Sequence, residues 1–574
     1  MIRRVFLSAL TLAAFATIPV LHGTAKEDRA ADRLSRIKHI VVVYEENHSF
    51  DNLYGSWEGV NGIDNAADAA RIQVNQQGVP FKCLGQNDPN LMTPPLSADC
   101  VDQTAAGLAA KSHFFNQPFT LDDYIQPTSL TCPNGVPGGA PGGCTRDLVH
   151  RFYQEQYQLN GGKQNRYTTG SDSVGLTMGA YATQQLPIYR YLHQPEHPHY
   201  AINDAFFQSA FGGSFLNHQW LVAAASPVWA NAPNDGGAND LHSVVDANGM
   251  PVNYPLYTSP LGANVKDLQL TASCNPAAGR AATPPGIACG DFAVNTTQPI
   301  NQPFSPNTPD PKKRLPVLDN LTIGDRLSAA GVDWAWYSGG WSNANGDING
   351  PGWTNGSGPG CADPNAFANA NFPNCPDKLF QFHHQPLNYF KSFAPGTAAR
   401  AAHLRDEEEF LQLAQSSKTS CNLKPVSFIK PVGAENEHPG YASESNGSDH
   451  LVELLKSIEE SSCAKDTLVI VAYDENGGTW DHVSPPGLGG PDSAHDIWGP
   501  GTRIPSLIIS PFLRGDFVVD HTAHDTTSIL ATIEHRFNLA PVASRDARVR
   551  DLSSVYLAKS PFDTDDRDED QRDR

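Results

Sequence analysis

The stretch that decides the fold runs from residue 37 to residue 51 and reads IKHIVVVYEENHSFD. Its first half is a run of β-branched apolar residues, which is typical of a strand buried on both faces. Its second half changes at once to side chains that bind metals and anions, beginning with Glu46 and Asn47. The same pattern recurs at residues 467–473, TLVIVAY, which are followed directly by DENGG. The two stretches predict two buried strands that each deliver polar groups where they end.

Four side chains at these strand ends form a candidate metal site. They are Glu46, Asn47, Asp474 and Glu475. Carboxylate and amide oxygens are hard donors that suit a divalent cation, which lowers the basicity of a nearby hydroxyl and polarises a phosphoryl oxygen. The alternative makes each carboxylate a helix cap or a surface residue, and it is weaker for two adjacent pairs than for one. We expect one divalent metal ion, and calcium, magnesium, manganese and iron all remain open.

Strand-like segments alternate with helical patterns along the chain, which favours an α/β domain with a mostly parallel sheet. Strands are expected at residues 37–44, 200–207, 332–337, 426–432, 467–473 and 504–510, and a helix at residues 449–460. Stretches with little apolar periodicity predict loop insertions at residues 59–103, 127–163, 231–314 and 343–377. In sheets of this kind, chemistry gathers at the carboxyl ends of the strands.

The two ends of the chain carry separate signals. Residues 1–25 combine an arginine pair, an apolar run and small residues, which predicts a cleaved export signal, with an N-terminal anchor as the alternative. The pair Arg3-Arg4 also resembles a twin-arginine signal, so the export route stays open. Residues 26–562 are expected to form a single catalytic domain, and residues 563–574 a disordered charged tail. The mature protein is therefore expected in the periplasm or outside the cell.

The ten cysteines fit an oxidising compartment. They lie at positions 83, 100, 132, 144, 274, 289, 361, 375, 421 and 463. Ten cysteines allow many connectivities, and the simplest is five disulfides between sequence neighbours, each closing an irregular loop. The spacing shows no CxxC pair and no Cys/His cluster of the kind that binds zinc.

The formal net charge of −21 becomes −23 when the two signal arginines are removed, which argues against nucleic-acid binding. Beyond the signal, no run of about 18 apolar residues predicts integral membrane association. The sequence leaves the oligomeric state open. A phosphate-binding pocket in so acidic a chain must be locally positive.

Ser214 is the candidate nucleophile, within the segment FGGSFLNHQ at residues 211–219. Two glycines permit a tight turn, and the serine then begins a helix-like pattern, where backbone N–H groups favour an anion. An ordinary helix-capping serine gives the same local pattern. The interpretation of Ser214 as a nucleophile is favoured only because the chain also contains a candidate metal site.

Six motifs in order resemble the bacterial phosphoesterase family of secreted acid phosphatases and phospholipases C, in the alkaline phosphatase superfamily. They are ENHSFDNLYG, MGAYATQQLPIYRYL, FGGSFLNHQ, ENEHPGYAS, YDENGGTWDHVSPP and GTRIPSLIISPF, and the resemblance covers residues 37–539 apart from the insertions. It implies an alkaline-phosphatase-like α/β sandwich with a mostly parallel central sheet, helices on both faces and long disulfide-stapled insertions. It also implies a reaction through a phosphorylated side chain held near a metal.

The resemblance assigns roles to individual residues. Ser214 matches the nucleophile, and Glu46, Asn47, Asp474 and Glu475 match the metal-site positions. His438 matches a histidine that contacts phosphate, and we expect it to protonate the leaving oxygen. Substrate-binding roles are implied more loosely for His113, Asn343, His383 and His384.

The resemblance leans toward the acid phosphatase branch, because Gly-Gly-Ser stands where the phospholipase branch tends to have Gly-Pro-Thr. The expected function is therefore that of an acid phosphatase, which hydrolyses small phosphomonoesters through a phosphoserine. An acid optimum is expected if the histidines keep an ordinary pKa near 6.5. The closest alternative is a phospholipase C that cleaves headgroup phosphodiesters. An exported protein that binds phosphate esters without turnover is the alternative from another class.

Overall fold

The computed structural model describes residues 25–91, 95–105, 107–129, 145–229, 244–245, 250, 254–258, 265–266 and 292–563. Only the last residue of the expected export signal, Ala25, and the first of the charged tail, Asp563, fall within these residues. Within them, no helix is long and apolar enough to cross a membrane.

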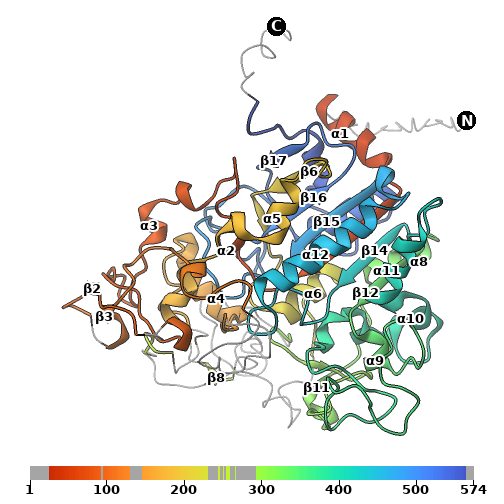
Figure 1. Cartoon of the computed structure of the whole chain (residues 1–574), viewed down its shortest axis with the longest axis horizontal. Helices are drawn as coiled ribbons and strands as arrows, with labels where there is room; N and C mark the ends of the chain where they lie inside the picture. The colour runs from red at the N-terminus through yellow and green to blue at the C-terminus, as the bar shows by residue number, and fades with distance from the viewer. Residues whose placement is uncertain are drawn as a thin grey trace, which may run out of the picture.

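A single eight-stranded sheet organises the molecule, with strand order β13-β12-β14-β1-β15-β16-β6-β17 (Figure 1). The strands are β1 (His39–Glu45), β6 (Tyr200–Asn203), β12 (Trp334–Ser338), β13 (Leu404–Asp406), β14 (Val426–Lys430), β15 (Thr467–Tyr473), β16 (Ser506–Ile509) and β17 (Phe517–Asp520). Only β16 runs antiparallel to its neighbours in this sheet. The expectation of a mostly parallel α/β sheet is confirmed.

Helices cover both faces of this sheet. α5 (Pro187–Leu192), α11 (Glu407–Ser416) and α12 (Glu444–Glu459) pack together in front of it in Figure 1. α6 (Ser214–Ala223), α8 (Ile323–Ala329) and α13 (Thr526–Phe537) pack together on the other face. Covering both faces explains why the central strands are apolar along their whole length.

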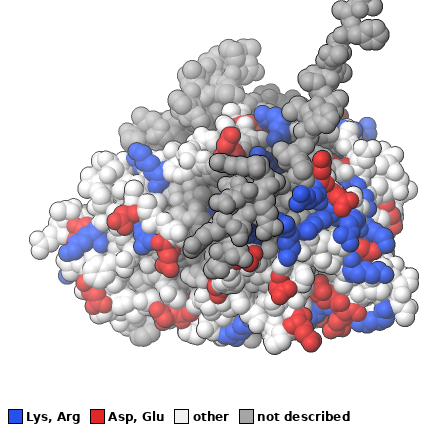
Figure 2. All heavy atoms as spheres, turned by 90° about the horizontal axis from the view of Figure 1, so that it is seen from above, with Lys and Arg blue, Asp and Glu red and all other residues white. Residues whose placement is uncertain are grey.

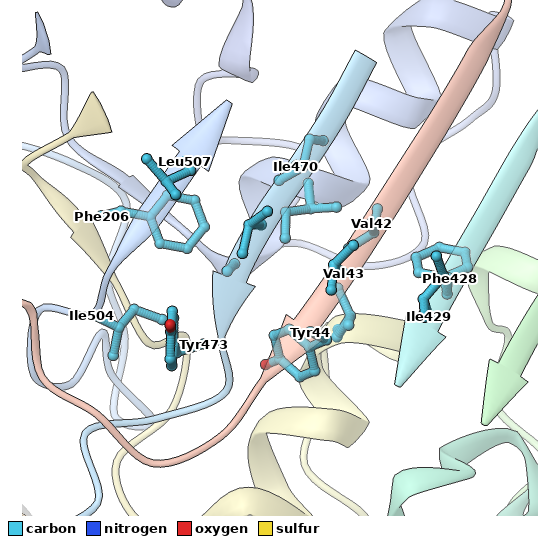
Figure 3. Packing of buried hydrophobic residues seen from close by; sticks show 14 of the residues in the cluster. Val42, Val43, Tyr44, Phe206, Phe428, Ile429, Ile470, Tyr473, Ile504 and Leu507 are labelled. Atoms are coloured by element: carbon cyan, nitrogen blue, oxygen red, sulfur yellow. The ribbon is translucent and has the colours of Figure 1, made fainter. Parts of the chain in front are cut away.

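The core forms where these strands and helices meet. All seven residues of β15 are buried, and β1 is buried beyond its first residue. Figure 3 shows Val42, Val43 and Ile470 packed along the adjacent strands, with Tyr44 and Tyr473 near their carboxyl ends. The core therefore supports the end of the sheet where the polar residues follow.

The structure corrects several predicted boundaries. The helix expected at residues 449–460 begins earlier, because Ser443 caps α12 by accepting a hydrogen bond from the backbone N–H of Asn446. The strand expected at residues 200–207 is split into β6 and β7 (Phe206–Phe207), which pairs with β18 (His524–Asp525) outside the main sheet. The short strands β13 and β17 were missed.

Three predicted disulfides are present, Cys83–Cys100, Cys361–Cys375 and Cys421–Cys463. The other four cysteines lie outside the described residues. Disulfides fit a protein of an oxidising compartment. On the face in Figure 2, acidic and basic side chains are interspersed among the visible residues, so the net negative charge does not gather there in one patch.

Candidate active site

The carboxyl ends of β1 and β15 place the predicted metal-type residues side by side. The strands are parallel and in register from His39 with Thr467 to Glu45 with Tyr473, so Glu46 and Asp474 leave the sheet together. The backbone N–H of Asn47 donates to Asp474 Oδ1 at 3.0 Å. Gly477 is required here, because a Cβ at this position would lie 2.1 Å from the carbonyl oxygen of Asn47.

Ser214 is the first residue of α6 and faces these strand ends. Its Oγ lies 3.0 Å from Glu46 Oε2 and 3.5 Å from both Asn47 Oδ1 and Glu475 Oε1. Gly212 has φ +91 in the preceding turn, where a Cβ would also lie 2.5 Å from the backbone nitrogen of Phe152. The turn therefore delivers the serine to residues distant in sequence, and the structure brings the predicted nucleophile and oxygen donors together.

Lys430 pairs with only one of the two carboxylate oxygens of Glu46. Its Nζ lies 2.5 Å from Glu46 Oε1 with both side chains fully buried, and it also donates to the carbonyl oxygens of Tyr44 and Glu45. Burial alone would raise the pKa of Glu46, but Lys430 and His384 outweigh it and hold this pKa well below its usual range. Glu46 is therefore ionised, with Oε1 paired to the ammonium and Oε2 facing Ser214.

The other two carboxylates, Asp474 and Glu475, pair with no lysine or arginine among the described residues. Burial raises the pKa of Asp474 well above normal, and the charge of Glu46 adds to this effect. Burial and Asp474 act in the same direction on the pKa of Glu475. Within the described chain, Asp474 Oδ2 is buried without a hydrogen-bond partner. This orphaned oxygen and the oxygen-rich donor set fit a divalent cation.

A second group of donors shares Glu46, since the ligand atoms of Glu46, His218 and His384 lie within 4.8 Å of one another. His384 Nε2 lies 2.9 Å from Glu46 Oε1, which is the oxygen that Lys430 already holds. A cation on that side would face an ammonium group. The side of Oε2, toward Ser214, Asn47 and Glu475, is therefore the better position.

Ser214 opens into a pocket of about 320 Å³. Polar residues on its wall are Asp147, His150, Arg151, Asn295, Thr296, Gln381, His383, His438 and Tyr441. His438 Nδ1 donates a hydrogen bond to the carbonyl oxygen of Pro439 at 2.7 Å, which leaves Nε2 available for proton exchange. The pocket thus combines a hydroxyl nucleophile with several groups that can bind or protonate an anion.

The histidines do not keep an ordinary pKa, contrary to the expectation from sequence. Burial lowers the pKa of His150, His383, His384 and His438, although nearby carboxylates oppose the effect at each ring. Their protonation therefore requires a lower pH than a solvent-exposed histidine does.

Three residues expected to bind substrate do not line this pocket, and one of them, His384, lies against Glu46 instead. His113 follows the short strand β3 (Lys111–Ser112), where Nδ1 pairs with Asp99 at 2.8 Å and Nε2 contacts the Tyr124 hydroxyl at 2.9 Å. Asn343 lies in α9 (Trp341–Asn345), and its side chain exchanges hydrogen bonds with Thr354. The side chains of His113 and Asn343 are held by their own loops.

Three residues that contact the predicted ligands and nucleophile were missed from sequence, as was Arg151 on the pocket wall. His150 Nε2 lies 3.1 Å from Glu475 Oε1 and 3.2 Å from Asn47 Nδ2, although residues 127–163 had been assigned to an insertion. That segment also contains α4 (Phe152–Leu159). His218 follows Ser214 by one helical turn and contacts its carbonyl oxygen at 2.8 Å, a spacing visible in FGGSFLNHQ. Lys430 was predicted only as a strand residue.

A buried ionic cluster joins the loops that follow β1 and β15. Arg503 contacts Asp51 at 2.9 Å and Asp481 at 3.0 Å, and His482 Nδ1 lies 2.6 Å from Asp51 Oδ2. The guanidinium offsets both carboxylates, so this cluster is satisfied without a metal. It holds the two metal-donor loops against each other.

A serine at a helix start, facing buried carboxylates at the carboxyl edge of an α/β sheet, is an arrangement that suits a hydrolase with a serine nucleophile. The chain belongs to the phosphoesterase family, whose model matches residues 37–540. This membership makes the protein a phosphoric ester hydrolase.

Its similarity to phospholipase C A of Mycobacterium tuberculosis is 25% identity, over 98% of this chain and 86% of the relative. The non-hemolytic phospholipase C of Burkholderia pseudomallei is 28% identical over 30% of this chain and 29% of its own. Among solved structures, the lipoteichoic acid synthase LtaP of Listeria monocytogenes covers 63% of this chain and 69% of its own at 8% identity, with a TM-score of 0.27. A TM-score that low supports no conclusion about fold or function.

Proposed function

We propose that this protein hydrolyses phosphomonoesters with the help of one divalent metal ion, through a phosphoserine at Ser214. The proposal rests mainly on the position of the Ser214 hydroxyl, which lies 3.0 Å from Glu46 Oε2 and lines a polar pocket. Glu46, Asn47, Asp474 and Glu475 would hold the cation. When bound, such a cation lowers the basicity of the hydroxyl and neutralises charge on phosphoryl oxygens.

Each residue of the site then has a separate role in the proposed reaction. His150, His383 and Arg151 bind the phosphoryl oxygens from the pocket wall. Ser214 Oγ, which faces Glu46 Oε2, attacks phosphorus in line with the ester oxygen and loses its proton to solvent in the pocket. The P–O ester bond breaks as protonated His438 gives its Nε2 proton to the leaving oxygen. Water then attacks the phosphoserine and gives a proton to neutral His438, and the Ser214 oxygen takes a proton from solvent as the P–O bond to serine breaks and phosphate leaves.

A phospholipase C is the second candidate, because part of the pocket wall is apolar. Leu148, Val149, Phe215, Leu216 and Val294 line the same pocket as the histidines. This wall would contact the glyceride part of a phospholipid while the headgroup phosphate faces Ser214. The similarity to proteins named phospholipase C supports this candidate.

Turnover of a soluble aryl phosphate and of phosphatidylcholine vesicles separates the two candidates. We expect the aryl phosphate to be the better substrate and Ser214→Ala to abolish its turnover. Ser226→Ala is the matched control, because this serine accepts from Trp220 Nε1 just beyond the other end of α6 and lies outside the pocket lining. Activity on the lipid alone would reject the phosphomonoesterase, and full activity of Ser214→Ala would reject the nucleophile.

The same proposal includes export to the periplasm or the medium, where small phosphate esters would be the substrates. Disulfides at Cys83–Cys100 and Cys421–Cys463 support an oxidising compartment.

A further inference from the structure

Behind the candidate active site, a second set of metal-type ligands lies on the face of the sheet covered by α11 and α12. The ligand atoms of Glu407, Glu435 and His450 lie within 4.8 Å of one another, and His450 Nε2 lies 2.9 Å from Glu407 Oε1. Donor atoms that share a metal at about 2.0–2.2 Å stand roughly 3 to 3.5 Å apart, so small side-chain adjustments would complete the site. Three different elements contribute: the start of α11, the loop after β14, and α12.

Glu45 supplies an independent reason to place a cation there. It is fully buried, and both of its carboxylate oxygens are without a hydrogen-bond partner among the described residues. The ring of the preceding Tyr44 contacts His218 on the α6 side of the sheet, so the alternation of a strand points Glu45 to the opposite side, toward α11 and α12. The charges of His450 and Glu407 reach Glu45 there and shift its pKa, although less than burial and Lys430 do.

With all of its carboxylates ionised, this group carries more negative than positive charge. Glu407 and Glu435 lie close to one histidine, His450, and Glu45 adds a third carboxylate, fully buried, whose charge interacts with this group. The charge of Lys430 also acts on Glu45, but its Nζ already pairs with Glu46 and donates to two backbone carbonyl oxygens. Proton uptake is the competing solution, since burial raises the pKa of Glu45 to about 8 and the Glu407 contact outweighs burial to raise the pKa of His450 to about 9.

The packing leaves room for these ligands. Gly339 follows β12, where a Cβ would lie 2.9 Å from Glu407 Oε2 and 2.5 Å from the backbone nitrogen of Val432. Glu435 is half-buried, which gives an ion access from solvent.

We propose that Glu45, Glu407, Glu435 and His450 form a second divalent metal site, separate from the one beside Ser214. Carboxylates with one imidazole favour a first-row transition cation such as Mn²⁺ or Zn²⁺ over Ca²⁺ or Mg²⁺, which prefer oxygen alone. An ion there would tie the ends of β1, β13 and β14 together directly behind Glu46, as a structural metal.

Metal counting on the whole protein tests this site. Protein stripped with a chelator is reloaded with Mn²⁺ or Zn²⁺, desalted and measured by elemental analysis. We expect two equivalents per chain in the wild type and one in Glu435→Gln and in His450→Gln. Glu453→Gln is the matched control, because this exposed glutamate lies one turn from His450 on α12 and outside the cluster, and it should retain two.

Asp474→Asn distinguishes the two sites, since it should lose only the ion beside Ser214 and keep one equivalent. If Glu435→Gln and His450→Gln bind as much metal as the wild type, the second site is refuted, even if the proposed hydrolysis stands. A crystal of the Zn²⁺-loaded wild type gives a test free of folding defects. An anomalous peak between Glu407, Glu435 and His450 supports the site, and its absence overturns it.

Discussion

At the scale of single residues, Lys430 determines how the active site carries its negative charge. Its ammonium pairs with one oxygen of Glu46 and leaves the other oxygen directed at Ser214. The site therefore depends on a residue that contacts neither the pocket nor the oxygen donors other than Glu46.

We predict that Lys430→Met lowers the free energy of unfolding by about 3–5 kcal/mol, because it leaves the buried carboxylate of Glu46 without its partner. Urea denaturation followed by circular dichroism measures the change. Lys418→Met is the control, since Lys418 pairs with Glu460 on the surface at 3.4 Å and its loss should cost no more than about 1 kcal/mol. Equal losses in the two variants would show that Lys430 does not hold the site together.

His438 is the second single residue to consider, because it is the proposed proton donor to the leaving oxygen. Burial lowers its pKa, with Asp147 and Glu46 opposing this effect. A lowered pKa means that the protonated ring is present only at acid pH and is lost as the pH rises through that value.

We therefore predict that kcat for a phosphomonoester with a poor leaving group falls as the pH rises, with a midpoint below 6.5. His438→Asn should remove this dependence and reduce kcat by about 10²–10⁴-fold. Initial rates across the pH range check both outcomes. A midpoint above 6.5, or an unchanged profile in the variant, would exclude His438 as the acid.

At the scale of elements, disulfides constrain segments that the main sheet does not. Cys421–Cys463 links the segment after α11 to the one after α12 across 42 residues, whereas Cys83–Cys100 closes a loop across 17 residues. The entropic cost of closing a loop in the unfolded chain grows with its length.

Replacing both cysteines of Cys421–Cys463 by serine should lower the free energy of unfolding by about 4 kcal/mol, and the same change at Cys83–Cys100 by about 3 kcal/mol. Urea denaturation without reductant compares the two double variants with the wild type. A larger loss for the shorter loop would show that packing around the disulfide, rather than chain entropy, dominates.

At the scale of the whole molecule, the sequence predicts the central sheet well, because apolar strands buried on both faces leave a clear pattern. β1 and β15 could be recognised from their β-branched runs, and their polar ends then predicted a shared site. β13 was missed because a strand of three residues carries too little periodicity, and β17 because its three apolar residues are flanked by Asp516 and Asp520. β16 could not be recognised as antiparallel, since orientation depends on its neighbours.

The candidate site was predictable where its residues follow a strong local pattern. Glu46 and Asp474 end buried strands, and Ser214 follows a Gly-Gly turn. His150 lies in an irregular stretch, and only the folded chain brings it to Glu475. The lowered pKa of the pocket histidines is likewise a property of burial, which no local pattern reveals.

The most direct test of the central claim is to trap the covalent intermediate. Purified protein is mixed with an aryl phosphate, quenched in acid within milliseconds and digested, and the peptide that contains Ser214 is analysed by mass spectrometry. We predict a phosphoryl group on Ser214 in the wild type and none in Ser214→Ala. Phosphorylation of another residue, or full turnover by Ser214→Ala without an intermediate, would contradict the account.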